Sequence, residues 1–261
     1  MSIEVKNLSF AYKQHEVLKN VSFKAENGQF VAVLGPNGAG KTTLFRCMLS
    51  FLKGYSGSIL CAGIDIKNAP VREMGKLMAY IPQSGAAVFN HTVMDLVLMG
   101  TTRQLAPFSS PGKKQVEEAE RAIEKLGITH LRSRGIANLS GGEMQLALIA
   151  RAVAQGAQTL IMDEPAASLD LGNRHRVLSL SSSLAREGYT VLMSMHDPEQ
   201  ALVFADRAIM LFKGEILADG TADEVISEKL IYEVYGIDVK ISSSDYGKGI
   251  FFKSPGSSME V

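Results

Sequence analysis

Apolar and polar residues alternate along the first part of the chain and then give way to longer apolar runs. Residues 3–34 contain two period-two segments, IEV and VSFKAE, and end in the unbroken apolar run FVAVL. Alternation is typical of a strand with one buried face, and an unbroken run suits a strand buried on both faces. Apolar residues then recur at helical spacing at Leu44, Phe45, Met48, Leu49 and Leu52. The pattern predicts a strand, a glycine-rich turn and a helix in succession, which is an α/β unit.

The middle of the chain, about residues 85–155, has mainly helical periodicity. One apolar stripe consists of Val116, Ala119, Ile123 and Leu126, and the segment PFSSPGKK before it has loop composition. The apolar runs TLIM and TVLMSM then return as buried strands with a helix between them. We therefore expect a helical subdomain inserted into an α/β core. The serine- and glycine-rich residues 241–261 are expected to form a small hairpin and a loose tail.

The composition indicates what type of protein this is and in which compartment it works, but it does not indicate which reaction it catalyses. The 261 residues are 46% apolar and 21% charged, which is ordinary globular composition. Lys plus Arg and Asp plus Glu number 27 each, so no global field favours nucleic acid or an anionic membrane surface. The two cysteines, Cys47 and Cys61, lie in apolar settings that suit reduced thiols, which favours the cytosol. We expect no signal peptide, and no run reaches the roughly 18 apolar residues of a membrane span.

The segment GPNGAGKT, residues 35–42, fits the phosphate-binding pattern G-x-x-x-x-G-K-[ST] and has the required strand before it and helix after it. Its glycines let backbone N–H groups curl around phosphates, and the helix N-terminus adds its positive end. Lys41 adds a point charge, and Thr42 can offer its hydroxyl to Mg²⁺. The alternative is a glycine-rich turn with a surface lysine.

Two carboxylates follow the strand LIM in the segment LIMDEP. Asp163 and Glu164 would lie at the carboxyl edge of the sheet, where α/β proteins bind ligands. Asp163 would hold Mg²⁺ directly or through its water, and Glu164 would polarise the water that attacks the γ-phosphate. The alternative is that the two acids cap a helix that starts at Pro165.

Histidine and glycine signals point to the same kind of site. The segment TVLMSMHDP ends a buried strand in His196, poised to bond the γ-phosphate or the attacking water. We expect structural or surface roles for the other four histidines, which are His15, His91, His130 and His175. In LSGGE, Ser140 and Glu143 form a capping box for the helix that follows. Two glycines in that first turn add nothing to a cap, but they suit a phosphate that must approach the backbone.

Taken in order, these motifs resemble the ATP-binding subunit of an ABC transporter over nearly the whole chain. The residues that carry the resemblance are 35–43, Gln83, 139–143, Asp163, Glu164, 167–170 and His196. The resemblance implies an α/β fold with a P-loop NTPase (RecA-like) core, an N-terminal antiparallel β subdomain and an inserted helical subdomain. It assigns residues 1–240 to the ATP-binding domain.

The family resemblance also implies a head-to-tail homodimer that holds two Mg-ATP between its subunits. ATP would contact Tyr12, Gly35, Asn37, Gly38, Ala39, Gly40, Lys41, Thr42 and Thr43 of one subunit and Ser140, Gly141, Gly142 and Asp170 of the other. Thr42, Gln83 and Asp163 would hold Mg²⁺, and Glu164, His196, Gln83 and Lys41 would be catalytic. Tyr12 would stack on adenine; the alternative is a core aromatic at the end of an amphipathic strand.

The resemblance implies that Gln83 touches Mg²⁺ and the attacking water, and that the residues after it form a groove for a short helix of the membrane subunit. An amide coordinates without adding charge, so it can move in and out of the site at little electrostatic cost. Val93, Leu96 and Val97 follow helical spacing and fit a core role equally well. Two departures from the family pattern are Met144, where a basic residue is usual, and AASLD in place of TSALD.

Three classes of function fit these motifs: a transporter motor, a soluble single-cassette ABC ATPase and a phosphate-binding module without turnover. Glu164 and His196 disfavour the third class, and the lack of a second cassette or heptad run disfavours the second. A stand-alone cassette favours an importer at the cytoplasmic face of the membrane, with permease subunits, an extracytoplasmic binding protein as an indirect partner and no nucleic acid. The segment DLVLMGTTRQLAPFSSPGKK resembles cassettes that import iron-siderophore, haem and cobalamin chelates.

Overall fold

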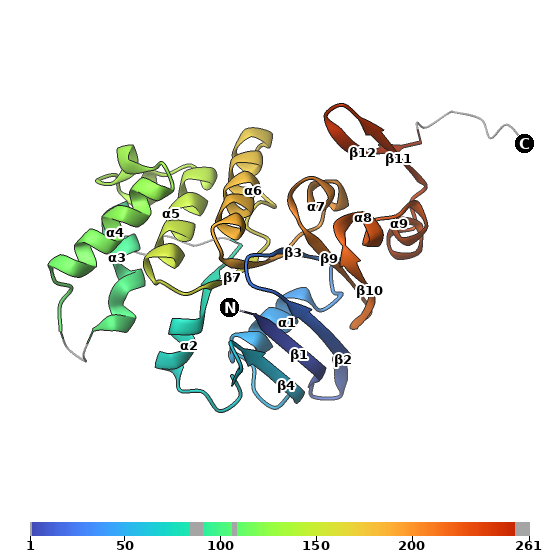
Figure 1. The fold of residues 1–261 in the computed structure, drawn as a ribbon, viewed down its shortest axis with the longest axis horizontal. Helices are drawn as coiled ribbons and strands as arrows, with labels where there is room; N and C mark the ends of the chain where they lie inside the picture. The colour runs from blue at the N-terminus through green and yellow to red at the C-terminus, as the bar shows by residue number, and fades with distance from the viewer. Residues whose placement is uncertain (1, 84–90, 106–108, 254–261) are drawn as a thin grey trace, which may run out of the picture.

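A computed structural model describes residues 2–83, 91–105 and 109–253, and it arranges them as three sheets flanked by helices (Figure 1). The strands are β1 (Ile3–Tyr12), β2 (His15–Ala25), β3 (Phe30–Leu34), β4 (Ser56–Cys61), β5 (Ile64–Asp65), β6 (Met78–Ile81), β7 (Thr159–Asp163), β8 (Thr190–Ser194), β9 (Arg207–Phe212), β10 (Glu215–Thr221), β11 (Val239–Ser244) and β12 (Gly247–Phe252). The α-helices are α1 (Lys41–Met48), α2 (Val71–Leu77), α3 (Val93–Gly100), α4 (Lys113–Lys125), α5 (Gly141–Ala154), α6 (Leu171–Arg186), α7 (Pro198–Phe204), α8 (Ala222–Val225) and α9 (Glu228–Tyr235). The predicted α/β class is confirmed.

The central sheet has the strand order β10-β9-β3-β8-β7-β6, and it is parallel except for the edge strand β10. Successive residues of β3 enter different cores, because side chains alternate across a sheet. Phe30, Ala32 and Leu34 belong to one apolar cluster, and Val31 and Val33 belong to the other. The unbroken run FVAVL is therefore a strand buried on both faces, as predicted.

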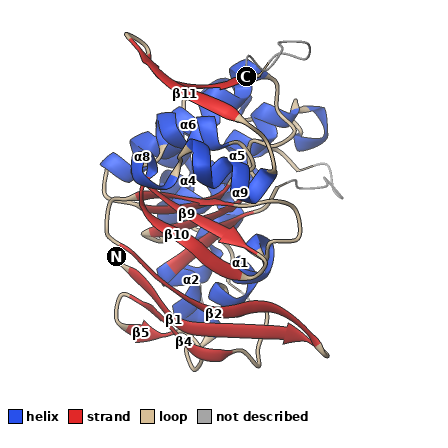
Figure 2. Ribbon diagram, turned by 90° about the vertical axis from the view of Figure 1, so that its right-hand side faces the viewer, coloured by secondary structure: helices blue, strands red, loops and turns tan. Residues whose placement is uncertain are grey.

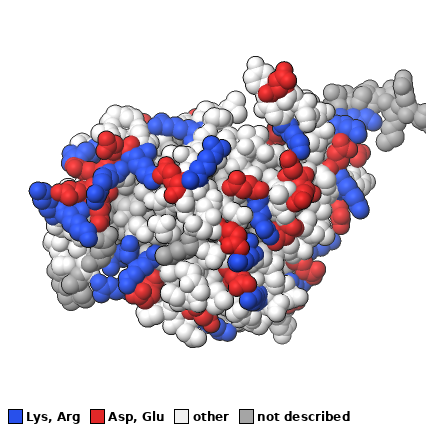
Figure 3. Space-filling view, in the orientation of Figure 1, with Lys and Arg blue, Asp and Glu red and all other residues white. Residues whose placement is uncertain are grey.

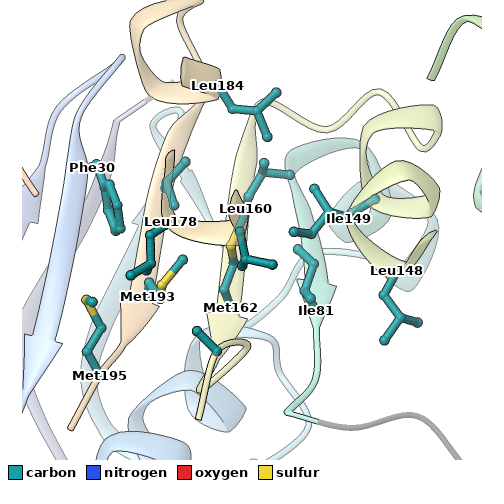
Figure 4. Packing of buried hydrophobic residues seen from close by; sticks show 14 of the residues in the cluster. Phe30, Ile81, Leu148, Ile149, Leu160, Met162, Leu178, Leu184, Met193 and Met195 are labelled. Atoms are coloured by element: carbon teal, nitrogen blue, oxygen red, sulfur yellow. The ribbon is translucent and has the colours of Figure 1, made fainter. Parts of the chain in front are cut away.

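Helices cover one face of the central sheet and join it to the helical subdomain. Figure 4 shows Leu160 and Met193 from neighbouring strands beside Ile149 of α5, and all three are fully buried. The other face packs on α1 and on the antiparallel sheet β2-β1-β4-β5, which lies below the helices in Figure 2. This second sheet is the antiparallel β subdomain that the family resemblance implies.

Helices α3, α4 and α5 gather at one end of the molecule (Figure 1). Val93, Leu96 and Val97 of α3 are buried in the larger apolar cluster, which confirms the core interpretation of these residues. Residues 84–90, which the resemblance assigns to a contact with the membrane subunit, lie outside the described part of the chain. Within that part, no helix is long and apolar enough to cross a bilayer.

Two local expectations differ from the structure. The first helix ends at Met48 and does not extend to Leu52, because Ser50 adopts a left-handed backbone with φ 55° that breaks the helix. The C-terminal hairpin starts at Val239, and Val239 and Ile250 bury one side of it. On the face shown in Figure 3, acidic and basic side chains interleave.

Candidate active site at the edge of the parallel sheet

A glycine-rich loop connects β3 to α1 and forms one wall of the candidate site. It begins at Gly35, which has φ 147°, and a Cβ built there would lie 2.1 Å from the carbonyl oxygen of Leu211. It ends at Gly40, which precedes α1 and has φ 109°. Both positions therefore require glycine, and the loop delivers the N-terminus of α1 to the carboxyl edge of the sheet.

Lys41, the first residue of α1, is held inside this loop. Its Nζ donates to the carbonyl oxygens of Gly35 at 2.7 Å and Pro36 at 3.2 Å, and it lies 3.7 Å from Oε1 of Glu164. The side chain is only 5% exposed, which contradicts the alternative of a surface lysine. Burial lowers the pKa of Lys41, although the charges of Glu164 and Asp163 oppose that effect. Incoming phosphate oxygens could replace the carbonyl oxygens as partners of this cation.

Asp163 is the last residue of β7, and the β7–β8 register places it opposite Ser194. Its Oδ1 accepts from the hydroxyl of Ser194 at 2.8 Å and from the hydroxyl of Thr42 at 3.2 Å. The strand and α1 thus bring a carboxylate and a hydroxyl together, and such hard oxygen donors are the ligands that Mg²⁺ takes alongside phosphate and water. These residues fit a site that shares the ion with a nucleotide. Among the described residues there is no cluster of three or more His, Cys, Asp or Glu suited to a metal ion.

Glu164 is fixed at its backbone and at both carboxylate oxygens. Its φ of 50° lies in the left-handed region that non-glycine residues rarely adopt, and its N–H donates to the Ser194 hydroxyl at 2.9 Å. Oε1 faces Lys41, and Oε2 lies 2.5 Å from Nε2 of His196. A carboxylate held between a lysine and a histidine beside a phosphate loop has the position of a general base.

The alternative role of the two acids as a helix cap is wrong. Residues 165–168 form a turn, and the next helix, α6, begins at Leu171 with Asp170 as its N-cap. His196 lies two residues beyond the end of β8, slightly later than the expected strand end, and it reaches back to Glu164. The neighbouring Asp197 caps α7 through the N–H of Glu199.

A hollow of about 360 Å³ opens over the phosphate loop. Its lining consists of Asn37, Gly38, Ala39, Gly40, Lys41, Thr42, Thr43, Glu164, His15 and Val17. Tyr12 pairs with His15 at the turn between β1 and β2. The Tyr12 side chain is 42% exposed and packs edge-on against Phe10, so the alternative of a core aromatic is wrong. Its place beside His15 leaves it free to stack on a flat ring next to the hollow.

Gln83 lies outside this constellation. It is exposed, two residues beyond the end of β6, and it is not among the residues that line the hollow. The strand β6 neighbours β7, so Gln83 leaves the sheet on the same edge as Asp163. Its assignment to Mg²⁺ and the attacking water stays a prediction.

The LSGGE segment starts α5 at a distinct surface. The Ser140 N–H donates to Glu143 Oε2 at 2.7 Å, and the Glu143 N–H donates to the Ser140 hydroxyl at 3.3 Å, which makes the capping box that the sequence predicts. The hydrogen bond from the Ser140 backbone lowers the pKa of Glu143. Among the described residues, those lining the hollow come from other segments of the chain.

The two glycines of LSGGE differ in their surroundings, and the expectation that both contact a ligand stays a prediction. A Cβ on Gly142 would lie 2.4 Å from Cγ of Asn173, so packing against α6 alone requires glycine there. A Cβ on Gly141 would meet Leu169 at an ordinary 3.4 Å, and Gly141 is exposed. Of these two glycines, Gly141 is the one for which no contact with a described residue requires glycine. Met144 is half-buried against the larger apolar cluster, so it acts here as a packing residue.

Three residues near the site were missed by the sequence analysis. Ser194 bonds both acids, Asn173 contacts Gly142 and also donates to Asp170 through its amide at 2.7 Å, and His15 lines the hollow. For Ser194 a signal was present, because it is a hydroxyl residue within an apolar strand two positions before His196. The partners of Asn173 become visible only when α5 and α6 are packed together.

Comparison with known proteins agrees with this geometry. Residues 18–167 match the family model described as "ABC transporter". The chain is 38% identical to a "Probable iron chelatin transport ATP-binding protein" of Helicobacter pylori, over 81% of this chain and 84% of that protein. It is 35% identical to the "Manganese transport system ATP-binding protein MntB" of Halalkalibacterium halodurans, over 89% and 91%.

A solved structure extends the similarity to the fold as a whole. The structure is of a transporter described as a metal-chelate type ABC transporter, in an inward-facing conformation. Its matched chain superposes with a TM-score of 0.85 at 28% identity, over 97% of this chain and 96% of that chain. The similarity therefore includes the C-terminal region as well as the part that the family model covers.

Proposed function

The chain belongs to the ABC transporter family, and from this premise we propose that it drives uptake of a metal chelate through a separate membrane permease. It is an ATPase of that family, and ATP is its nucleotide. The observation that carries the hydrolytic part of this proposal is the convergence of Lys41, Glu164 and His196 beside Thr42 and Asp163 at one edge of the sheet. A binding module without turnover has no need for a carboxylate held in this way.

Each residue of the site has a defined task in hydrolysis. Lys41 and the N–H groups of residues 38–42 hold the β- and γ-phosphates. Thr42 and Asp163 would hold Mg²⁺, and the ion would supply neutralisation of phosphate charge. Glu164 accepts a proton from the water whose oxygen attacks the γ-phosphorus, while the bond to the bridging oxygen breaks and ADP leaves with that electron pair. His196 keeps the Glu164 carboxylate oriented.

The site is completed by a second copy of the chain in head-to-tail orientation. Ser140 and Gly141 are exposed at the N-terminus of α5, where backbone N–H groups suit an anion. Asn173 packs against Gly142 and bonds Asp170, so the LSGGE and ASLD segments form one rigid surface. That surface supplies the γ-phosphate contacts of the partner's ATP, and the dimer therefore has two composite sites.

The permease contact is a groove of about 1130 Å³ between the core and the helical subdomain. Phe51, Val71 and Met99 expose apolar surface along it, with Phe51 62% exposed. Its cationic side chains are Lys53, Lys67, Arg72, Arg103 and Arg151, and its described lining contains no Asp or Glu. A short amphipathic helix with acidic residues fits this combination of apolar and positive surface.

The cargo is a metal chelate of the iron-siderophore, haem or cobalamin kind. The names of the relatives from H. pylori and H. halodurans refer to iron chelatin and manganese, and the solved transporter is described as of metal-chelate type. An extracytoplasmic binding protein would deliver the chelate, and this chain would act at the cytoplasmic face of the permease. Manganese is the competing cargo that these relatives suggest.

The test is uptake into vesicles that contain this chain together with a membrane permease that co-purifies with it. Siderophore iron, haem, cobalamin and Mn²⁺ are supplied separately with ATP inside. We expect ATP-dependent uptake of one chelate, none with Lys41→Ala, and normal uptake with the exposed control Lys24→Ala. Uptake of Mn²⁺ alone would overturn the cargo. An active ATPase that never co-purifies with a membrane protein would favour a soluble ABC ATPase instead.

A further inference from the structure

Ser194 lies at the end of β8, next to the end of β7, and it bonds both acids of the site. It is the last residue of β8, it is 1% exposed, and it lies opposite Asp163 in the β7–β8 register. Its hydroxyl donates to Asp163 Oδ1 at 2.8 Å and accepts the backbone N–H of Glu164 at 2.9 Å. The Ser194 hydroxyl therefore donates to the carboxylate of Asp163 and accepts from the backbone of Glu164 at the same time.

The second of these bonds matters because of the backbone conformation of Glu164. A glutamate at φ 50° is in a region that L-residues avoid, and such a conformation persists only where surrounding contacts fix it. The side-chain contacts with Lys41 and His196 act on the carboxylate, which can turn about its own torsions. The bond to Ser194 acts on the main chain, and it sets the direction in which the side chain leaves β7.

We propose that Ser194 is a positioning residue that holds the Glu164 main chain so that its carboxylate faces the γ-phosphate. This inference rests on the proposed function, in which Glu164 is the general base. Without the hydroxyl, the N–H of Glu164 loses the acceptor that fixes its left-handed backbone, and the peptide is then free to turn. The carboxylate then leaves the line of attack, and a general base acts efficiently only within hydrogen-bond reach of its water.

The chain offers a conservative substitution and a matched control. Ser194 lines a cavity of about 110 Å³ together with Glu164, Met193 and His196, so the extra methyl group of Ser194→Thr has room while the hydroxyl is kept. Ser181 is also fully buried, and it bonds Val177 O at 2.8 Å within α6. Ser181→Ala deletes an equally buried hydroxyl that contacts neither acid.

The experiment measures kcat and KM for Mg-ATP, nucleotide affinity and melting temperature for the three variants. We expect Ser194→Ala to lower kcat at least about 10-fold, with KM and nucleotide affinity within about threefold. Its melting temperature should fall no further than that of Ser181→Ala, which keeps full kcat. Ser194→Thr should restore kcat. A loss of kcat in Ser181→Ala equal to that in Ser194→Ala would show a merely structural effect and overturn the inference.

Two further arms separate this inference from its premise. In a Glu164→Gln background, Ser194→Ala should cause no additional loss, because both changes act on one step. If Glu164→Gln itself hydrolyses ATP at the wild-type rate, the assignment of Glu164 as the base is wrong. If Glu164→Gln loses hydrolysis but Ser194→Ala keeps the wild-type kcat, only the positioning role of Ser194 is wrong. A kcat defect that excess Mg²⁺ abolishes, together with weaker Mg²⁺ binding, would assign the hydroxyl to Asp163 and overturn the role at Glu164.

Discussion

The phosphate loop and the LSGGE segment both present a helix N-terminus, yet they differ in how completely the chain satisfies them. Lys41 is buried, bonded to two carbonyl oxygens of its own loop and close to Glu164. At α5, the capping box satisfies Ser140 and Glu143, but Gly141 stays exposed without a contact that explains it. The first half of the site is assembled within one chain, whereas the second leaves an exposed glycine that the proposed dimer would use.

The two helix starts therefore lead us to expect two kinds of defect. A substitution at one should affect the ATP site of its own chain, and a substitution at the other should affect the ATP site of the partner. A change in the phosphate loop or at Glu164 removes chemistry from the chain that carries it. A change at Gly141 should leave that chain's own loop intact and, in the proposed dimer, should affect the site that holds the partner's ATP.

The largest effect is expected for Glu164→Gln, which keeps size and hydrogen bonding but removes charge and basicity. Loss of a general base typically costs about 10²- to 10⁴-fold in rate, so hydrolysis should nearly stop. ATP binding should persist, because less negative charge then lies beside the phosphates. Two chains should close on two ATP molecules and remain closed, as measured by size-exclusion chromatography with light scattering. A variant that stays monomeric at high ATP would contradict the proposed sandwich.

The next effect is a loss of hydrolysis in Gly141→Leu without a loss of nucleotide affinity in the monomer. The side chain would project where the partner's phosphate should approach, so turnover should fall at least about 10-fold. Fluorescent-nucleotide titration of the monomer should stay within about twofold of wild type, because no loop contact changes.

Mixing experiments give the control for Gly141→Leu. A heterodimer of this variant with Lys41→Ala has both lesions in one composite site and leaves the other intact. The mixture should therefore regain activity relative to either variant alone. If Gly141→Leu unfolds, or if mixing restores nothing, the segment does not act in trans.

Local motifs explain why so much of the site could be predicted from the sequence. The loop glycines, Lys41, Asp163 and Glu164 lie within or next to short segments whose spacing encodes their geometry, and the apolar runs beside them define the strands. Ser194 bonds an acid 31 positions away, and its partner depends on which strands are neighbours in the sheet. No pattern of apolar residues gives that strand order.

The helices show a similar limit. Periodicity predicted the helix after the phosphate loop, but not its end, because a single left-handed residue at Ser50 stops it. It also gave no sign that Gly142 is required by Asn173, since that contact forms only when α5 meets α6. Local spacing therefore identifies reacting groups, whereas the residues that hold them in place emerge from tertiary packing.

A smaller effect, on stability, should separate the two glycines of LSGGE. Gly142→Ala brings a Cβ to 2.4 Å from Asn173, whose side chain is also tied to Asp170, and such overpacking costs roughly 1–3 kcal/mol. Gly141→Ala meets no close neighbour and should leave the free energy of unfolding unchanged or raise it by up to about 1 kcal/mol. Urea unfolding of both variants is the measurement. Equal stability of the two variants would contradict the packing role of Gly142.

The smallest effect concerns the charge of the capping box, through Glu143→Gln. The Ser140 N–H lowers the pKa of Glu143 below its ordinary 4.5, so the charged form stabilises the fold above about pH 4.5. This contribution is lost as pH falls through the lowered pKa. At pH 7 the free energy of unfolding of the variant should be lower by about 0.5 kcal/mol, which is the usual contribution of an anion at a helix N-terminus, and the difference should vanish in acid.

Glu120→Gln is the matched control, because Glu120 pairs with Arg132 as Glu143 pairs with Arg134, but within α4 instead of at a helix start. Urea unfolding at pH 7 and at a descending series of pH values below 4.5 measures both, and an equal loss in the control would assign the effect to the ion pair and leave the helix start without electrostatic support.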